Sequence, residues 1–250
     1  NEKLLFLRWN VLFINCINMV ISFLLGIIFF YLGYKLSGLI KTLKVKILLS
    51  FVILIFCIPA LSFVMYYLQL INETTWYVEF RSIPHIEISS SIICLFFGFI
   101  CFRDEKNRKV KLKLLNKYFF VISLLIVFVP FSKPILLPID KNIQFNDQWE
   151  NGVCIQSTHS TCGPASLATV FKYYGQDIKE KEIAKNSYSS SRGTENWYMI
   201  RYARSIGYSV EVLDIDNLND VPIPSIIGTY INNIGHFITV LGVEEDRYII

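Results

Sequence analysis

An α-helical membrane domain followed by an α+β globular domain is the fold class that this sequence predicts. The chain is 53% hydrophobic with a mean hydropathy of +0.45, which is too apolar for an ordinary soluble protein. Long apolar runs occupy its first part, whereas from about residue 142 the composition becomes charged and glycine-punctuated, with short elements of both kinds. We therefore divide the chain into a membrane domain at 1–140 and a globular domain at 141–250, with 141–152 as the linker.

Four apolar runs predict about four transmembrane helices, at residues 11–34, 47–71, 84–102 and 118–138. The first two carry no charge, and at about 1.5 Å per residue each can cross a bilayer of about 30 Å. The third has only fifteen uncharged residues after Glu87, and the fourth has Lys133 and two prolines near its end. Buried core helices or re-entrant segments are the alternative for these two, but two clear spans beside them favour spanning.

The segments that connect the spans differ in their basic residues. The first and third hold four and seven Lys or Arg, whereas the second holds only Arg81 beside Glu73 and Glu79. Because basic loops stay in the cytoplasm, the segments alternate in, out, in, and the globular domain is expected outside the cytoplasm. Trp76, Tyr77, Tyr66 and Tyr67 then fit an outer aromatic belt in contact with the lipid bilayer.

The globular part begins with a cysteine at the start of a helix. Apolar residues recur at helical spacing after Cys162, Pro164 stands where a first turn tolerates it, and Gly175 closes the run. The positive end of a helix dipole stabilises a thiolate, so this position favours a reactive cysteine. Gln156 lies six residues earlier, and its amide with the Cys162 N–H could stabilise the oxyanion of an acyl transfer.

A partner for the thiol is sought among the three histidines. His236 opens the apolar strand 236–243, where a ring is out of place unless it faces a cleft, so we predict it as the general base. A histidine that merely starts a strand and faces solvent is the alternative. His159 is a rival base that would need a tight bend to reach the thiol, and His85 belongs to the membrane part.

Further elements are expected between these residues. Helices are predicted at 178–184 and 194–206, with a polar loop between them at 187–192. Strands are predicted at 208–213 and 225–230, and the strand 236–243 forms a hairpin with 247–250.

Two alternatives for Cys154 compete with the enzyme interpretation. It could form a structural disulfide with Cys162 in an oxidising exterior, or a metal site with His159 and Cys162. The metal site is disfavoured by irregular spacing and by the lack of an evident fourth ligand. Neither metal nor cofactor is therefore expected. Without a P-loop, a dinucleotide fingerprint or a nucleic-acid motif, the sequence predicts no nucleotide or nucleic-acid partner.

The globular part resembles the C39 family of papain-like cysteine peptidases. The resemblance rests on Gly152 to Gln156, Cys162-Gly163-Pro164-Ala165, Gly193-Thr194 and Gly235 to Val243, within about the last hundred residues. It implies a papain-like fold, Cys162 as nucleophile, His236 as base and Gln156 as oxyanion donor. Members include the peptidase domains of bacteriocin exporters, which cut leader peptides after a double glycine.

Two departures from the family pattern set the expectation for function. The orienting Asp of the family has no match before Ile250, so we expect the domain to continue beyond that residue, and no ATP-binding motif supports an exporter. The prediction is a membrane-anchored cysteine peptidase that hydrolyses peptide bonds by a Cys-His mechanism and acts on leader or surface peptides. A catalytically silent, peptide-binding module beside a membrane or transporter partner is the alternative, and a transporter with an accessory domain ranks last.

Overall fold

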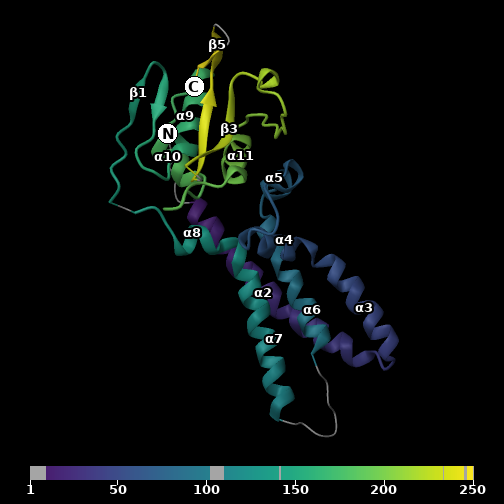
Figure 1. Ribbon diagram of the computed structural model, residues 1–250. Helices are drawn as coiled ribbons and strands as arrows, with labels where there is room; N and C mark the ends of the chain where they lie inside the picture. The colour runs from purple at the N-terminus through teal and green to yellow at the C-terminus, as the bar shows by residue number, and fades with distance from the viewer. Residues whose placement is uncertain (1–9, 102–109, 141, 233, 245–246, 250) are drawn as a thin grey trace. The chain divides into compact units, whose positions relative to one another are not determined.

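The computed structural model describes residues 10–101, 110–140, 142–232, 234–244 and 247–249 (Figure 1). The chain forms two compact units. One comprises Asn1–Asn72 with His85–Ser132, and the other comprises Glu73–Pro84 with Lys133–Ile250. The second unit thus contains residues 73–84, which the sequence-based division assigns to the membrane part.

All regular elements among the described residues of the first unit are helices. It contains α2 (Asn10–Leu39), α3 (Leu43–Phe56), α4 (Ile58–Tyr67), η1 (Ile86–Ile92), α6 (Ile93–Ile100), α7 (Val110–Phe128) and η2 (Val129–Phe131). Asn15–Leu39 and Lys113–Leu136 are each long and apolar enough to cross a membrane. Two bent pairs, α3 with α4 and α5 (Thr75–Ser82) with η1–α6, pass the same test only when each pair is taken as one span. The chain therefore has two to four helices that can cross.

The second predicted span, 47–71, is not one straight helix. Helices α3 and α4 meet at a bend of 60° beside Cys57. Pro59 stands in the first turn of α4 and explains the break, because proline lacks the N–H that would bond to the Ile55 carbonyl and its ring clashes with that group. The absence of charge in this run therefore did not guarantee a continuous helix.

The third predicted span consists of the 3₁₀ helix η1 followed by α6. A 3₁₀ helix rises about 2.0 Å per residue against about 1.5 Å in an α-helix, so these fifteen residues extend about 26 Å. The change of helix type lengthens a run that is short for a transmembrane α-helix.

Helices α2 and α6 pack against each other (Figure 1), and glycines bring their backbones close together. A Cβ placed on Gly33 would lie 2.2 Å from the Leu95 carbonyl oxygen, and one on Gly98 would lie 2.1 Å from the Phe30 carbonyl oxygen. Small residues allow such approaches in membrane helices, where dispersion contacts replace the hydrophobic effect as the force that holds helices together.

The second unit combines short helices and strands. Its elements are α5 (Thr75–Ser82), α8 (Ser132–Leu136), β1 (Gln148–Glu150), β2 (Val153–Ile155), α9 (Cys162–Tyr173), α10 (Glu180–Asn186), α11 (Asn196–Ser205), η3 (Leu218–Asp220), β3 (Ser225–Ile231), β4 (Ile234–Val240), β5 (Gly242–Glu244) and β6 (Arg247–Ile249). The strands form three antiparallel pairs, β1–β2, β3–β4 and β5–β6. This region of helices and strands follows the helices that are long and apolar enough to cross a membrane, as predicted.

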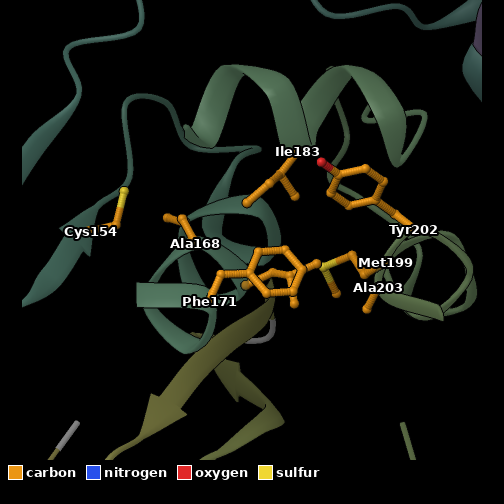
Figure 2. Close-up of a cluster of buried hydrophobic side chains, with 9 residues drawn as sticks. Cys154, Ala168, Phe171, Ile183, Met199, Tyr202 and Ala203 are labelled. Carbon is orange, nitrogen blue, oxygen red and sulfur yellow. The ribbon is translucent and has the colours of Figure 1, made fainter. Parts of the chain in front are cut away.

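The core of the second unit lies between α9, α10 and α11. Figure 2 shows Phe171 near its centre, with Cys154 on one side and Met199 and Ala203 on the other. The apolar positions at helical spacing after Cys162 therefore bury one face of α9, which accounts for the helix that the sequence predicts.

Helix α5 packs against α11 inside the second unit. Arg81 is fully buried and its guanidinium carbon lies 4.2 Å from the centre of the Trp197 ring. Arg204 donates to both oxygens of the Glu79 carboxylate, at 2.9 and 3.0 Å. Tyr77 is also fully buried, with its ring centre 6.1 Å from that of Trp197. The assignment of Tyr77 to a lipid-facing belt was therefore wrong, because it packs on the globular part.

Several predicted elements are confirmed with small shifts, and three differ. Helices α10 and α11 and strand β3 lie where expected, and the strand predicted at 236–243 divides into β4 and β5. The linker 141–152 contains strand β1. Residues 208–213 form no strand. In this segment the Tyr208 ring packs on Phe171 at 4.9 Å between centres, and Arg204 donates to the Val210 carbonyl. The predicted final hairpin is confirmed by the antiparallel pairing of β5 with β6, and its residues 245, 246 and 250 lie outside the described residues.

Candidate active site

Cys162 is the first residue of α9, as the sequence predicts. It is 7% exposed, so the thiol lies just beneath the surface. The N–H groups of Cys162 and Gly163 have no acceptor within the helix, because the first four N–H groups of a helix precede its ladder. Pro164 has no N–H to satisfy, and Ala165 already donates to the Thr161 carbonyl at 3.0 Å. The helix start therefore places N–H groups that have no acceptor within the helix beside a thiol.

The loop before the thiol is held by its own hydroxyls. Thr161 Oγ1 donates to the Thr158 carbonyl at 3.1 Å and accepts from the Thr158 N–H at 3.0 Å. Ser160 Oγ lies 3.1 Å from Thr158 Oγ1. Thr161 is fully buried and Ser160 is 8% exposed. These local bonds fix the approach of the chain to Cys162.

The first turn of α9 packs directly on β4, the strand that carries His236. A Cβ on Gly163 would lie 2.7 Å from Met199 Sδ and 3.3 Å from Phe237 Cδ2. One turn later, Thr239 Oγ1 donates to the Ser166 carbonyl at 3.2 Å, and Ser166 Oγ donates to the Phe237 carbonyl at 3.3 Å. The structure therefore brings the neighbours of Cys162 and His236 in the sequence into contact.

The His236 side chain belongs to the other face of the β3–β4 hairpin. Phe237 pairs with Gly228, whereas His236 pairs with Thr229. Because side chains alternate along a strand and Phe237 points toward α9, the pleat puts His236 on the opposite face, half-exposed. Within the described residues no hydrogen bond joins His236 to Cys162 or Gln156. The two segments meet, but the imidazole and the thiol are not paired in this structure.

Gln156 lies in a segment that is anchored on both sides. The Cys154 N–H donates to Thr169 Oγ1 at 2.9 Å, and Thr169 Oγ1 donates to the Ala165 carbonyl at 2.9 Å. The Ser157 N–H donates to Glu180 Oε1 at 2.9 Å. Gln156 is half-buried between these anchors, one of which is on the helix that begins with Cys162.

Sequence reasoning missed the residues that hold this segment. Glu180 stands among charged neighbours, so the sequence indicates a solvated surface residue. Thr169 is one polar residue within the helical pattern after Cys162, and nothing in that pattern indicates a partner for it. Yet Glu180 is 1% exposed and Thr169 is 1% exposed. The signal in the sequence is the spacing of Glu180, which stands three and four residues before the apolar pair Ile183-Ala184 and therefore shares the inward face of α10 with it.

Cys154 is a buried core residue. Both Cys154 and Cys162 are free thiols, so the alternative of a disulfide between them is not supported. Burial raises the pKa of the Cys154 thiol to about 12, and the nearby Glu180 and Asp147 carboxylates act in the same direction. Cys154 therefore stays protonated at neutral pH and is a poor nucleophile.

The remaining histidines of the chain are His159 and His85. His159 is exposed in the loop before α9, and His85 belongs to the first unit, where Nδ1 lies 2.9 Å from Asn18 Nδ2. In the parts of the chain that the structure describes, no group of three or more His, Cys, Asp or Glu side chains could hold a metal ion.

Residues 150–250 match the model of the Peptidase C39 family. An uncharacterized protein of Methanothermobacter thermautotrophicus is 28% identical over 93 residues, which are 37% of this chain and 65% of that relative. The chain therefore spans less than two thirds of the relative's length. No solved structure matches. The resemblance that the sequence indicates is confirmed, and the C-terminal part of the chain carries a C39 peptidase-like domain.

Proposed function

From the C39 peptidase-like domain and the arrangement around Cys162, we propose that the protein is a membrane-anchored cysteine peptidase of papain-like fold. The observation that carries the proposal is the thiol at the start of α9, in a turn that packs through Gly163 on the strand of His236. A helix start supplies the N–H groups, and the adjacent strand supplies the imidazole, that a thiol peptidase needs.

The proposed reaction is acyl transfer through a thioester. His236 takes the proton of Cys162, and the Cys162 sulfur attacks the carbonyl carbon of a peptide bond. The Cys162 N–H and the Gln156 amide stabilise the negative oxygen of the tetrahedral intermediate. The protonated His236 then gives its proton to the leaving amine, and water hydrolyses the thioester to release the acid and the free thiol.

This mechanism requires His236 to approach the thiol when a peptide binds. The imidazole starts from the other face of the hairpin, because His236 is the third residue of β4 (Ile234–Val240) and its side chain lies on the face opposite to Phe237. Catalytic hydrogen bonds are often absent in free enzymes and form only in the complex. The unpaired imidazole and thiol also fit the alternative, a catalytically silent module that binds peptides, and a hydrolysis assay distinguishes the two.

Selective alkylation tests the nucleophile. At pH 7 iodoacetamide should label Cys162 at least about tenfold faster than Cys154, because a thiol with a pKa of about 12 has only about 10⁻⁵ of its population as thiolate. Mass spectrometry of the full chain in detergent measures both rates, and a peptide library measures hydrolysis. Labelling of Cys154 should rise only at strongly alkaline pH.

Two histidine variants provide the matched comparison. His236→Ala should abolish hydrolysis and slow the alkylation of Cys162, whereas His159→Ala, an exposed histidine near the thiol in sequence, should leave both within about twofold. Equal effects of the two substitutions, or an intact protein without hydrolysis, would favour the silent module.

We further propose that the C39 peptidase-like domain lies outside the cytoplasm on a multi-pass membrane protein. The second unit includes α5 from the segment that contains only one basic residue, and α5 is held there by Arg81 and by Arg204. Because both ends of residues 85–132 thus join one folded unit, this stretch crosses the bilayer an even number of times or not at all. The domain then shares the side of residues 73–84 in either case, and the proposed substrates are peptides on that side.

Accessibility of single cysteines tests this topology. In a Cys-free background, Asp177→Cys should react with a membrane-impermeant maleimide in intact cells, whereas Lys41→Cys should react only after permeabilisation. Both positions are exposed, so the difference reports the side of the membrane. The opposite pattern would place the domain in the cytoplasm.

A further inference from the structure

The carboxylate of Glu180 lies behind the segment that carries Gln156. Glu180 is 1% exposed, and both of its oxygens accept from Ser157. The backbone N–H of Ser157 donates to Oε1 at 2.9 Å, and its hydroxyl donates to Oε2 at 2.5 Å. A charged group is rarely buried unless it is hydrogen-bonded, because burial removes its hydration. This pair of bonds therefore joins α10 to the residue next to Gln156.

The Ser157 hydroxyl extends the contact to the chain before β1. It accepts from the Asn146 N–H at 3.0 Å while it donates to Glu180. The adjacent residues form a second link, because Lys179 lies 2.5 Å from the Asp147 carboxylate. The Lys179 ammonium lowers the pKa of Asp147 by hydrogen bonding. The start of α10 is thus tied at two points to the same turn of chain.

Gln156 is the residue that these anchors enclose. Two residues earlier, Cys154 is bonded to Thr169 on α9, and one residue later, Ser157 is bonded to Glu180 on α10. Its backbone is therefore fixed with respect to the helix that starts at Cys162. An oxyanion donor must be held in place before the reaction, because its contribution depends on preorganisation.

We propose that Glu180 is a positioning residue that acts through Ser157 to hold the Gln156 amide toward the oxyanion site. This inference rests on the proposed peptidase function. Glu180 touches no reacting atom; it fixes the backbone on one side of Gln156, while Thr169 fixes it on the other. A purely structural role, in which Glu180 only anchors α10, predicts different kinetics.

A double-mutant cycle separates the two roles. Gln156→Ala should lower kcat about 100-fold with little change in KM, because it removes a donor that acts on the transition state. Glu180→Gln leaves one acceptor oxygen for two donors and should lower kcat about tenfold. In the Gln156→Ala background the same substitution should cost less than about twofold, because the group it positions is already absent.

Two matched variants show whether the lower kcat of Glu180→Gln comes from the lost contact with Ser157 or from a general loss of folding. Ser157→Ala should reproduce the kinetic effect of Glu180→Gln. Glu182→Gln makes the same charge change on the same helix, but Glu182 interacts with Tyr202, so it should leave kcat within about twofold. Amide hydrogen exchange of residues 155–161 should be faster in Glu180→Gln than in the wild type, independently of activity.

The outcomes distinguish this inference from the function on which it rests. An active wild type with additive losses in the cycle, or with unchanged exchange of residues 155–161 in Glu180→Gln, would overturn the role of Glu180 alone. A folded wild type without hydrolysis would overturn the proposed function and this inference with it.

Discussion

Replacing Cys162 by alanine is expected to reduce peptide hydrolysis by at least about a thousandfold. The thiol is the only group in the proposed mechanism that forms a bond to the substrate, and removal of a nucleophile abolishes the covalent route. The rate is measured with the full-length protein in detergent, on a peptide that the wild type cleaves. Cys162→Ser should be nearly as inactive, because a serine hydroxyl is a much weaker nucleophile at neutral pH.

Cys154→Ala supplies the control for this loss. Cys154 lies eight residues before Cys162, is 5% exposed and has a thiol with a raised pKa. The substitution therefore tests whether hydrolysis depends on any buried thiol near the site or on Cys162 itself. We expect hydrolysis within about threefold of the wild type. Cleavage that survives in Cys162→Ala, or that is lost equally in both variants, would remove Cys162 from its proposed role.

The start of α9 could be predicted because its signals are local. A proline in the first turn, apolar residues at helical spacing and a closing glycine all lie within fourteen residues of one another, so Cys162 was placed at the helix start from sequence alone. The placement of His236 has a different basis. The sequence indicates that it opens a strand, but the face on which its side chain lies depends on pairing with β3 and on the contact of Phe237 with Gly163.

The residues around the site that escaped prediction are those held by distant partners. Glu180 bonds to Ser157 across 23 residues, and Arg204 bonds to Glu79 across 125. Neither partner can be read from spacing or periodicity, because both depend on how separate segments pack. The same applies to Tyr77, whose aromatic character fits a membrane interface as well as it fits the surface of α11.

In the membrane part, hydropathy predicts the apolar helices but not their bends or their contacts. Apolar runs correctly indicate helices that can cross a bilayer, but a run without charge says nothing of a bend at Pro59. It also says nothing of which glycines serve as contacts. Gly26, Gly33 and Gly98 look alike in sequence, yet the first would place a Cβ against a side-chain sulfur and the other two against backbone.

We expect Gly98→Ala to destabilise the first unit by about 3 kcal/mol or more. Its Cβ would lie 2.1 Å from the Phe30 carbonyl oxygen and 3.0 Å from the Phe30 Cα, and backbone atoms cannot turn aside as a side chain can. The two helices must separate, which costs the dispersion contacts along their interface. Gly33→Ala should behave alike, because its Cβ would meet the Leu95 carbonyl oxygen at 2.2 Å.

Gly26→Ala is the control, because Gly26 lies on α2 as Gly33 does. It distinguishes the effect of close backbone packing from a general effect of replacing glycine by alanine. Its Cβ would lie 3.0 Å from Cys94 Sγ, a side-chain atom that can move. Each change from glycine to alanine within a helix stabilises the helix by up to about 1 kcal/mol through propensity. This contribution is common to the three variants, so differences between them report packing. Denaturant unfolding in micelles, followed by helical circular dichroism, should then show a loss for Gly33→Ala and Gly98→Ala and little change for Gly26→Ala. Equal stabilities of the three would mean that α2 and α6 do not approach through their backbones.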